Sequence, residues 1–135
     1  MSDVEPLVYF IDPDEEMGDI KGLCADAAVE TRFFSSAEDF LANFDASRVS
    51  CLVTDCTLPG MNSLDLMRRL RECGHFVPTI LLAECSEVST VVAAVKAGAK
   101  DCVEKEAGNK RVFDKICETL HLARRPCSIN VKATF

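Results

Sequence analysis

The sequence predicts an α/β fold, a three-layer sandwich in which helices cover both faces of a five-stranded parallel sheet. Five short apolar or β-rich segments alternate along the chain with segments whose apolar residues recur at helical spacing. Short strands that are nearly continuous in apolar residues are typical of a parallel sheet buried on both faces. Right-handed crossovers then place the carboxyl ends of all the strands at one edge of the sheet.

Composition indicates a single folded domain. A chain of 135 residues can bury one core, which we expect in residues 1–123, and residues 124–135 lose the pattern and are interpreted as a tail or linker stub. There is no secretory signal pattern, and no apolar stretch approaches the roughly 20 residues of a membrane helix. We therefore expect a cytoplasmic protein with no membrane contact.

Charge and cysteine content exclude other classes of protein. The net charge of −7 argues against direct nucleic-acid binding by this segment, because such binding depends on neutralising phosphates. The eight cysteines have no regular CxxC spacing, and most lie within apolar strand or helix patterns. Without an export signal, they are expected to be reduced and mostly buried thiols.

The first two strands are expected at Leu7–Ile11 and Glu30–Phe34. Between them, residues 16–28 have apolar residues at helical spacing. Ser35 and Ser36 are each followed three residues later by an acid, which offers two registers of a capping box for the next helix. One face of that helix carries Phe40, Leu41 and Phe44.

The middle of the chain contains two more strands and a helix. The third strand is expected at Cys51–Thr54 and the fourth, opened by Pro78, at Thr79–Ala83. Between them, Asn62 begins a helix and has an acid, Asp65, three residues later. The apolar positions of this helix are Leu64, Met67 and Leu70.

The last strand, Asp101–Glu104, lies between two helices. Ser86 is placed to cap a helix over residues 87–97, and Gly98 is a suitable residue to end it. Its apolar positions are Val88, Val91, Val92 and Val95. The final helix is expected over residues 110–123, with its apolar positions Val112, Ile116 and Leu120 directed at the core.

Three charged residues follow predicted strands directly or end them. Asp12 and Asp55 end the first and third strands, and Lys105 follows the fifth. Ligands collect at the carboxyl ends of parallel strands, so these charges indicate a site for a divalent cation and a phosphoryl group. A single Asp after a strand is usually only a turn residue, but three compatible charges at one edge favour a site. The loop after the first strand is acidic and lacks a glycine-rich phosphate cradle, so nucleotide binding is not expected.

Several motifs, in their order and spacing, resemble the receiver domain of bacterial two-component response regulators, closest to the nitrogen-fixation transcriptional regulator subgroup. They are FIDPDEE, SAEDFL, LVTDCTLPGMNSLDLMRRL, PTILL and VKAGAKDCVEK, and the resemblance covers residues 6 to about 122. It implies the strand order 2-1-3-4-5 of flavodoxin-like sheets. It also implies a phospho-accepting signalling domain that is not an enzyme, with a histidine kinase as its partner in a phosphorelay.

The resemblance assigns a role to each charged residue of the strand ends. Asp55 becomes the phospho-acceptor, and Mg²⁺ is held by Asp12, Asp55 and the backbone carbonyl of Thr57. Lys105 pairs with Asp55 before transfer and with the phosphate afterwards. The last two helices (residues 87–97 and 110–123) become the surface for partners or for a homodimer.

This chain departs from the receiver pattern at the metal site. Receivers have two adjacent acids after the first strand, and here Pro13 follows Asp12. Asp14 is a further candidate metal ligand, but Pro13 suits the entry to a helix, which favours Asp14 as its N-cap. With one carboxylate missing, we expect Mg²⁺ to bind weakly.

The chain departs further from the receiver pattern at the positions that transmit phosphorylation. Ala83 ends the fourth strand where receivers have Thr or Ser, and Ser86 lies three residues too late to replace that hydroxyl. Cys102 stands in place of the switch aromatic, and Glu106 in place of a proline. The nucleophilic half of the site is therefore better preserved than the signalling half.

Three hypotheses follow. The first is a phosphorylatable receiver with altered switching, and the second is a pseudo-receiver that binds partners without phosphoryl transfer. The third and least favoured is a thiol redox sensor built on Cys56, Cys85 and Cys102, with Lys105 available to lower the pKa of a neighbouring thiol. Free cysteines are more often simply buried small hydrophobes.

Overall fold

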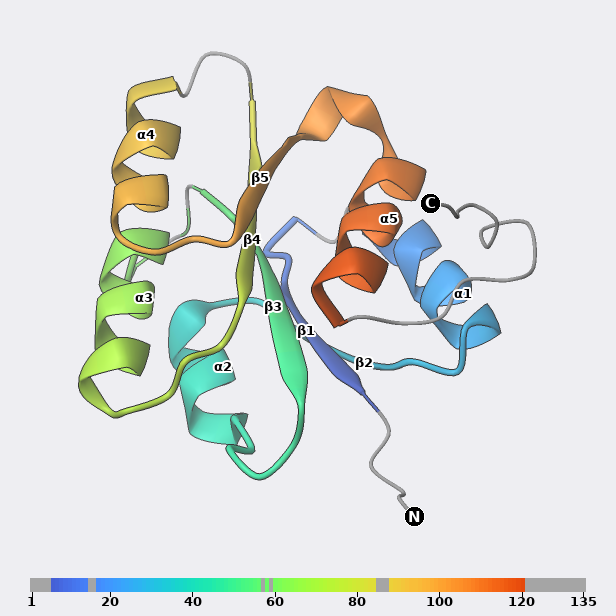
Figure 1. Cartoon of the computed structure of the whole chain (residues 1–135), viewed down its shortest axis with the longest axis horizontal. Helices are drawn as coiled ribbons and strands as arrows, with labels where there is room; N and C mark the ends of the chain where they lie inside the picture. The colour runs from blue at the N-terminus through green and yellow to red at the C-terminus, as the bar shows by residue number, and fades with distance from the viewer. Residues whose placement is uncertain (1–5, 15–16, 57, 59, 85–87, 121–135) are drawn as a thin grey trace, which may run out of the picture.

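The computed structural model describes residues 6–14, 17–56, 58, 60–84 and 88–120 of the chain. A central sheet is covered on one face by the first and last helices and on the other by the three helices between them (Figure 1). The predicted tail, residues 124–135, and the predicted end of the last helix lie outside the described residues. The predicted three-layer α/β sandwich is confirmed.

The sheet has five parallel strands in the order β2-β1-β3-β4-β5, as the resemblance implied. The strands are β1 (Leu7–Ile11), β2 (Glu30–Phe34), β3 (Ser50–Asp55), β4 (Thr79–Ala83) and β5 (Asp101–Glu104). The central strand β3 is buried along its whole length, since β1 and β4 flank it and helices cover both of its faces. Its carboxyl end therefore lies in the middle of the sheet edge.

In the described part of the chain, α-helices α1 to α4 connect the strands, and a short 3₁₀ turn and α5 follow the last strand. These elements are α1 (Gly18–Asp26), α2 (Ala37–Asn43), α3 (Ser63–Glu72), α4 (Val88–Lys96), the turn η1 (Lys105–Ala107) and α5 (Asn109–Leu120). Helices α1 and α5 pack together on one face (Figure 1). No helix in the described part of the chain has the length and apolar character needed to cross a membrane.

The core divides between the two faces because residues alternate along each strand. From β1, Val8 and Phe10 pack toward α1 and α5, whereas Leu7, Tyr9 and Ile11 pack toward α2 and α3. The buried Tyr9 hydroxyl accepts a hydrogen bond from the N–H of Asp45, at 2.9 Å. This bond satisfies the polar end of an otherwise apolar ring.

Two predicted helix caps are confirmed. Ser36, the later of the two possible registers, accepts a hydrogen bond from the N–H of Asp39 at 3.1 Å. Asn62 accepts one from the N–H of Asp65 at 2.9 Å. Each side chain satisfies one of the N–H groups that a helix start leaves without a partner.

The expectation that Asp14 caps the first helix is wrong. Helix α1 begins at Gly18 with Met17 as its N-cap, and Met17 makes no side-chain cap. The N–H of Met17 instead donates to Oδ2 of Asp12 at 2.9 Å. Asp12 therefore organises the start of α1 from the end of β1, and the exposed Asp14 lies in the turn between them.

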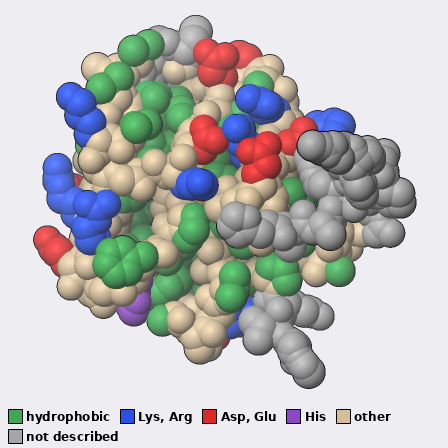
Figure 2. Space-filling model, in the orientation of Figure 1, with side chains coloured by type: hydrophobic (Ala, Val, Ile, Leu, Met, Phe, Trp, Pro, Cys, Tyr) green, Lys and Arg blue, Asp and Glu red, His purple; other side chains and the backbone are tan. Residues whose placement is uncertain are grey.

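Helix α4 differs from the amphipathic helix expected from its valines. Three of its four apolar positions are exposed, with Val88 at 66%, Val92 at 48% and Val95 at 51%. The helix packs on the rest of the domain mainly through a small residue, the fully buried Ala94, with Val91 partly buried. As a result, hydrophobic side chains gather over α4 at the upper left of the molecule (Figure 2).

Candidate functional site

Two buried carboxylates lie side by side at the carboxyl edge of the sheet. Asp55 is the last residue of β3 and is 4% exposed, and Asp12, which follows β1, is 6% exposed. The pairing of Ile11 with Thr54 places them at equivalent positions on adjacent strands. Buried acids are uncommon unless charges or hydrogen bonds compensate them, which makes this edge the strongest candidate site.

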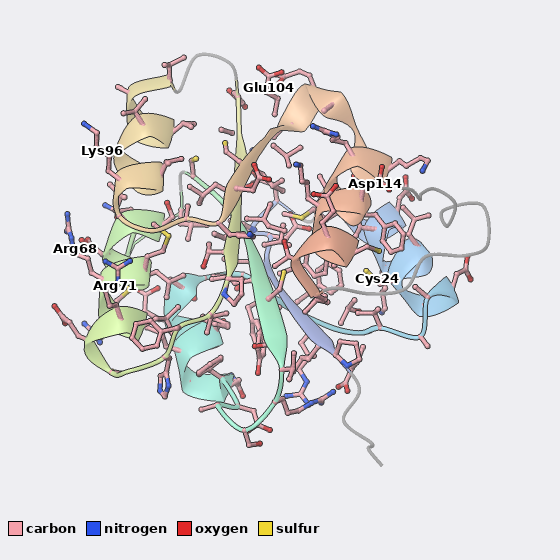
Figure 3. The ribbon with its side chains drawn as sticks, viewed as in Figure 1. Cys24, Arg68, Arg71, Lys96, Glu104 and Asp114 are labelled. Carbon is pink, nitrogen blue, oxygen red and sulfur yellow. The ribbon has the colours of Figure 1, made fainter. Side chains whose placement is uncertain are left out.

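Lys105 supplies the positive charge that the site needs. It begins η1 directly after Glu104, the last residue of β5, which is labelled in Figure 3. Its Nζ lies 3.5 Å from Oδ1 of Asp55, although the two residues come from different strand ends. The structure thus brings together three of the predicted site residues, Asp12, Asp55 and Lys105.

A small cavity of about 90 Å³ adjoins the pair formed by Asp55 and Lys105. Its other lining residues come from the starts of α1 and α5 and the end of β4: Met17, Ile20, Leu82, Gly108, Asn109 and Val112. The cavity is thus lined by both charged and apolar side chains. A small charged group reaching Asp55 would enter a partly apolar environment, where electrostatic interactions are stronger than in water.

The donor atoms at this edge fit Mg²⁺. This ion takes hard oxygen ligands, commonly one or two carboxylates completed by water, and Asp12 and Asp55 supply two. Within the described part of the chain, no three His, Cys, Asp or Glu side chains are grouped to hold a metal ion. Among the described residues, the site therefore offers the carboxylates of Asp12 and Asp55. Asp14 is exposed, and Thr57, whose carbonyl was the third predicted ligand, lies outside the described residues.

The chain after Asp55 is held by a residue that the sequence analysis did not identify. Ser63, the first residue of α3, donates from Oγ to the carbonyl oxygen of Cys56 at 2.9 Å. Ser63 is 1% exposed, so this hydrogen bond is shielded from water. The only signal in the sequence was a serine directly after the predicted N-cap Asn62, a position that has no fixed role in capping.

The same loop is tied to α2 farther along the chain. Oε2 of Glu38 accepts a hydrogen bond from the N–H of Met61 at 3.2 Å. Gly60 turns the chain there with φ of +72°, and a Cβ at that position would meet the same carboxylate at 3.0 Å. Glycine is suited to this turn both by its backbone angle and by the proximity of Glu38.

The two altered switch positions are surrounded by apolar side chains. Ala83 is buried with Cys56, Met67, Leu81 and Ala94, and Cys102 packs against this group as a partly buried residue. Neither Ala83 nor Cys102 carries a hydroxyl or an aromatic ring. We call this set of six residues the small-residue cluster, and it lies between the sheet and the helices α3 and α4, which contribute Met67 and Ala94.

The cysteines expected near the active edge differ in exposure. Cys56 is buried and Cys102 is partly buried, whereas Cys85 lies outside the described residues. A reactive thiol needs solvent access, which the buried Cys56 lacks. The redox hypothesis therefore gains no support from Cys56.

Comparison with known proteins identifies the family. The family model described as response regulator receiver domain matches residues 11–117. This chain belongs to the response regulator receiver domain family. It is thus a member of a signalling-domain family, and the predicted family is confirmed.

Curated relatives and solved structures agree with this assignment. The chain is 32% identical over 124 residues to the response regulator protein TodT of Pseudomonas putida, covering 91% of this chain and 55% of TodT. It is 28% identical over 106 residues to the transcriptional regulatory protein FixJ of Bradyrhizobium diazoefficiens, covering 78% of this chain and 52% of FixJ. The crystal structure of FixJ-N superposes on this chain with a TM-score of 0.76 at 28% identity, covering 92% of this chain and 99% of that one. The receiver chain spans about half the length of the curated relatives it matches.

Proposed function

We propose that this receiver domain accepts a phosphoryl group from a histidine kinase on Asp55, in the presence of Mg²⁺. The observation that carries the proposal is the buried Asp55 carboxylate at the end of the central strand, 3.5 Å from Lys105 Nζ and beside Asp12. Membership of the receiver family supports it, because the matched region includes all three residues.

In the proposed reaction, an Asp55 carboxylate oxygen attacks the phosphorus of a phosphohistidine. The new O–P bond forms as the P–N bond breaks, and the leaving imidazole takes up a proton. Lys105 moves from Asp55 to an oxygen of the transferred group and offsets its charge there. Asp12 and Asp55, with the carbonyl of Thr57, would hold Mg²⁺, which neutralises charge on the phosphoryl oxygens.

The test is direct phosphorylation by a small donor. Incubation with Mg²⁺ and acetyl phosphate should add one phosphate to the wild-type chain, measured as intact mass. Asp55→Asn should gain none, because the amide is a poor nucleophile. A wild-type mass that stays unchanged under high donor and Mg²⁺ concentrations would sink the proposal.

A second candidate function is favoured by the small-residue cluster. Ala83 and Cys102 lack the groups that bind phosphate or change rotamer in a switch, so the fold could act as a pseudo-receiver that binds partners without phosphorylation. In that case Asp55→Asn would bind the partner as tightly as the wild type does. Partner affinity that rises with acetyl phosphate only in the wild type would exclude it.

The surface for partners is proposed to include α4 and α5. The exposed Val88, Val92 and Val95 offer apolar area on α4, which suits a histidine kinase, a downstream protein or a second copy of this chain. We also propose that residues 1–123 form the receiver domain and that residues 124–135 are a tail or linker stub. The family match, which spans residues 11–117, supports this division.

A further inference from the structure

We propose that Ser63 is a positioning residue for the site: its hydroxyl fixes the backbone that follows Asp55 and thereby sets how well the site takes up Mg²⁺. The inference rests on the proposed function. It begins with the hydrogen bond from Ser63 Oγ to the Cys56 carbonyl, at 2.9 Å between two buried residues. Nothing in the receiver assignment requires a hydroxyl at position 63.

Both peptide groups that flank Cys56 are anchored. The N–H of Cys56 donates to the carbonyl of Leu82 on β4 at 3.0 Å, and the carbonyl of Asp55 accepts from Thr54 Oγ1 at 3.2 Å. The following carbonyl, that of Cys56 itself, is held by Ser63. The backbone angles at Cys56 are therefore fixed from both sides, directly beside the residue proposed to carry the phosphoryl group.

The Ser63 hydroxyl is not needed to start its own helix. Asn62 is the N-cap of α3, and its side chain already accepts from the N–H of Asp65. Ser63 stands one position later, and its hydroxyl bonds to the loop that leaves the sheet instead. The bond thus ties the start of α3 to the end of β3, across the loop that contains the expected metal ligand Thr57.

Loss of this hydroxyl should loosen the site. The Cys56 carbonyl would be left in a buried environment without its hydroxyl donor. The loop would then be freer to move, and the carbonyl of Cys56 could turn toward another partner. Sites that hold ligands in a fixed geometry depend on such supporting hydrogen bonds. The expected effect on Mg²⁺ is modest, because one neutral hydrogen bond corresponds to about a threefold to tenfold change in an equilibrium constant.

The test measures Mg²⁺ uptake without a phosphodonor, by calorimetry or by amide NMR shifts. For Ser63→Ala, the Mg²⁺ concentration at half-saturation should rise about threefold to tenfold. Ser63→Thr keeps the hydroxyl and should restore most of the wild-type affinity. If Ser63→Ala does not fold, Ser63→Cys, which keeps a weaker donor of similar size, should show an intermediate loss.

A matched control separates positioning from stability. Ser36→Ala removes another serine hydrogen bond, the N-cap of α2, and should lower the unfolding midpoint without changing the Mg²⁺ curve. The inference is overturned if Ser63→Ala takes up Mg²⁺ as the wild type does, or if the wild type shows no saturation. If Ser63→Ala weakens Mg²⁺ uptake but acetyl phosphate adds no phosphate to the wild type, the proposed function fails while the positioning role stands.

Discussion

At the scale of single residues, Lys105 and a bound metal ion would both interact with the negative charge of Asp12 and Asp55. A lysine 3.5 Å from Asp55 compensates part of the negative charge of the edge, and a metal ion at the same edge would do so too. In the proposed reaction, the lysine and the ion would therefore compete for the same electrostatic interaction before transfer. After the proposed transfer they would cooperate, because the phosphoryl group would bring more negative charge than either one offsets.

Lys105→Met should separate these two effects. Removal of the positive charge should tighten Mg²⁺ binding, since the ion no longer meets a cation at Asp55. Phosphorylation by acetyl phosphate at saturating Mg²⁺ should slow roughly tenfold to hundredfold, as when a charge-stabilising group is lost. Lys110→Met, at an exposed lysine of α5, is the control and should change neither measurement. If Lys105→Met is phosphorylated as fast as the wild type, Lys105 takes no part in the phosphoryl transfer.

Thiol chemistry provides another prediction at the residue scale. Burial, with a contribution from the neighbouring Cys117, raises the pKa of Cys24 to about 11, and burial with Cys24 nearby raises that of Cys51 to about 12. The exposed Cys73 has no such burial. Alkylation at pH 7.5, followed by peptide mass spectrometry, should therefore label Cys73 well before Cys24 or Cys51. Early labelling of Cys24 in the folded protein would contradict the packing of α1 on the sheet. Labelling of the unfolded protein in urea, where burial no longer protects any cysteine, is the control.

The elements differ in how firmly they are attached to the domain. Helix α5 is joined to β5 by an ion pair in which Lys115 Nζ lies 2.9 Å from Asp101 Oδ2, and α1 packs along it. Among the described side chains of helix α4, Ala94 is fully buried, whereas Val88, Val92 and Val95 are exposed. We therefore expect α5 to be a fixed part of the scaffold and α4 to be the helix on which partners act.

The pair formed by Asp101 and Lys115 predicts an acid-sensitive contribution to stability. Burial would raise the pKa of Asp101, but the hydrogen bonds from Lys115 and from the N–H of Cys102 outweigh it, and the pKa lies below its usual value. The stabilisation is thus fully present above the unfolded-state pKa of about 3.9 and is lost as pH falls through the lower folded value.

Asp101→Asn should therefore be slightly less stable than the wild type at pH 7, measured by urea unfolding. The difference should shrink at pH 3, because protonation removes the same interaction from the wild type. The effect should be small, since more than a third of the Asp101 side chain is exposed. If the difference in free energy of unfolding between the two proteins stays constant between pH 7 and pH 3, the ion pair is not the source of that difference.

The exposed face of α4 can be tested by charge substitution. Val92→Lys and Val95→Lys should each leave the free energy of unfolding within about 0.5 kcal/mol of the wild type, because both side chains are substantially exposed. If a second copy binds this face, both variants should weaken self-association in sedimentation experiments with acetyl phosphate. Dimerisation equal to that of the wild type would place the dimer contact elsewhere.

At the scale of the whole molecule, the alternating strand and helix patterns were sufficient to predict the layers, because buried parallel strands have a distinctive composition. Boundaries were less predictable: β3 extends over Ser50–Asp55 rather than Cys51–Thr54, and α1 begins at Gly18 rather than at residue 16. The start of α1 is set by the hydrogen bond to Asp12, a contact between elements that local pattern does not reveal.

The candidate site was predictable in part for a similar reason. Asp12, Asp55 and Lys105 follow strands, so the topology brings them to one edge, and the resemblance supplied their roles. Ser63 was not predictable, because its role depends on how the loop after Asp55 folds back onto the start of α3. The exposure of the α4 valines likewise depends on how α4 lies on the sheet.

We propose that Asp55 itself receives the phosphoryl group. The most direct measurement is peptide mapping of the chain after treatment with Mg²⁺ and acetyl phosphate, with and without neutral hydroxylamine, which cleaves acyl phosphates. We predict one added phosphate on the peptide that contains Asp55, and its removal by hydroxylamine. Phosphate on another peptide, or phosphate that resists hydroxylamine, would contradict it.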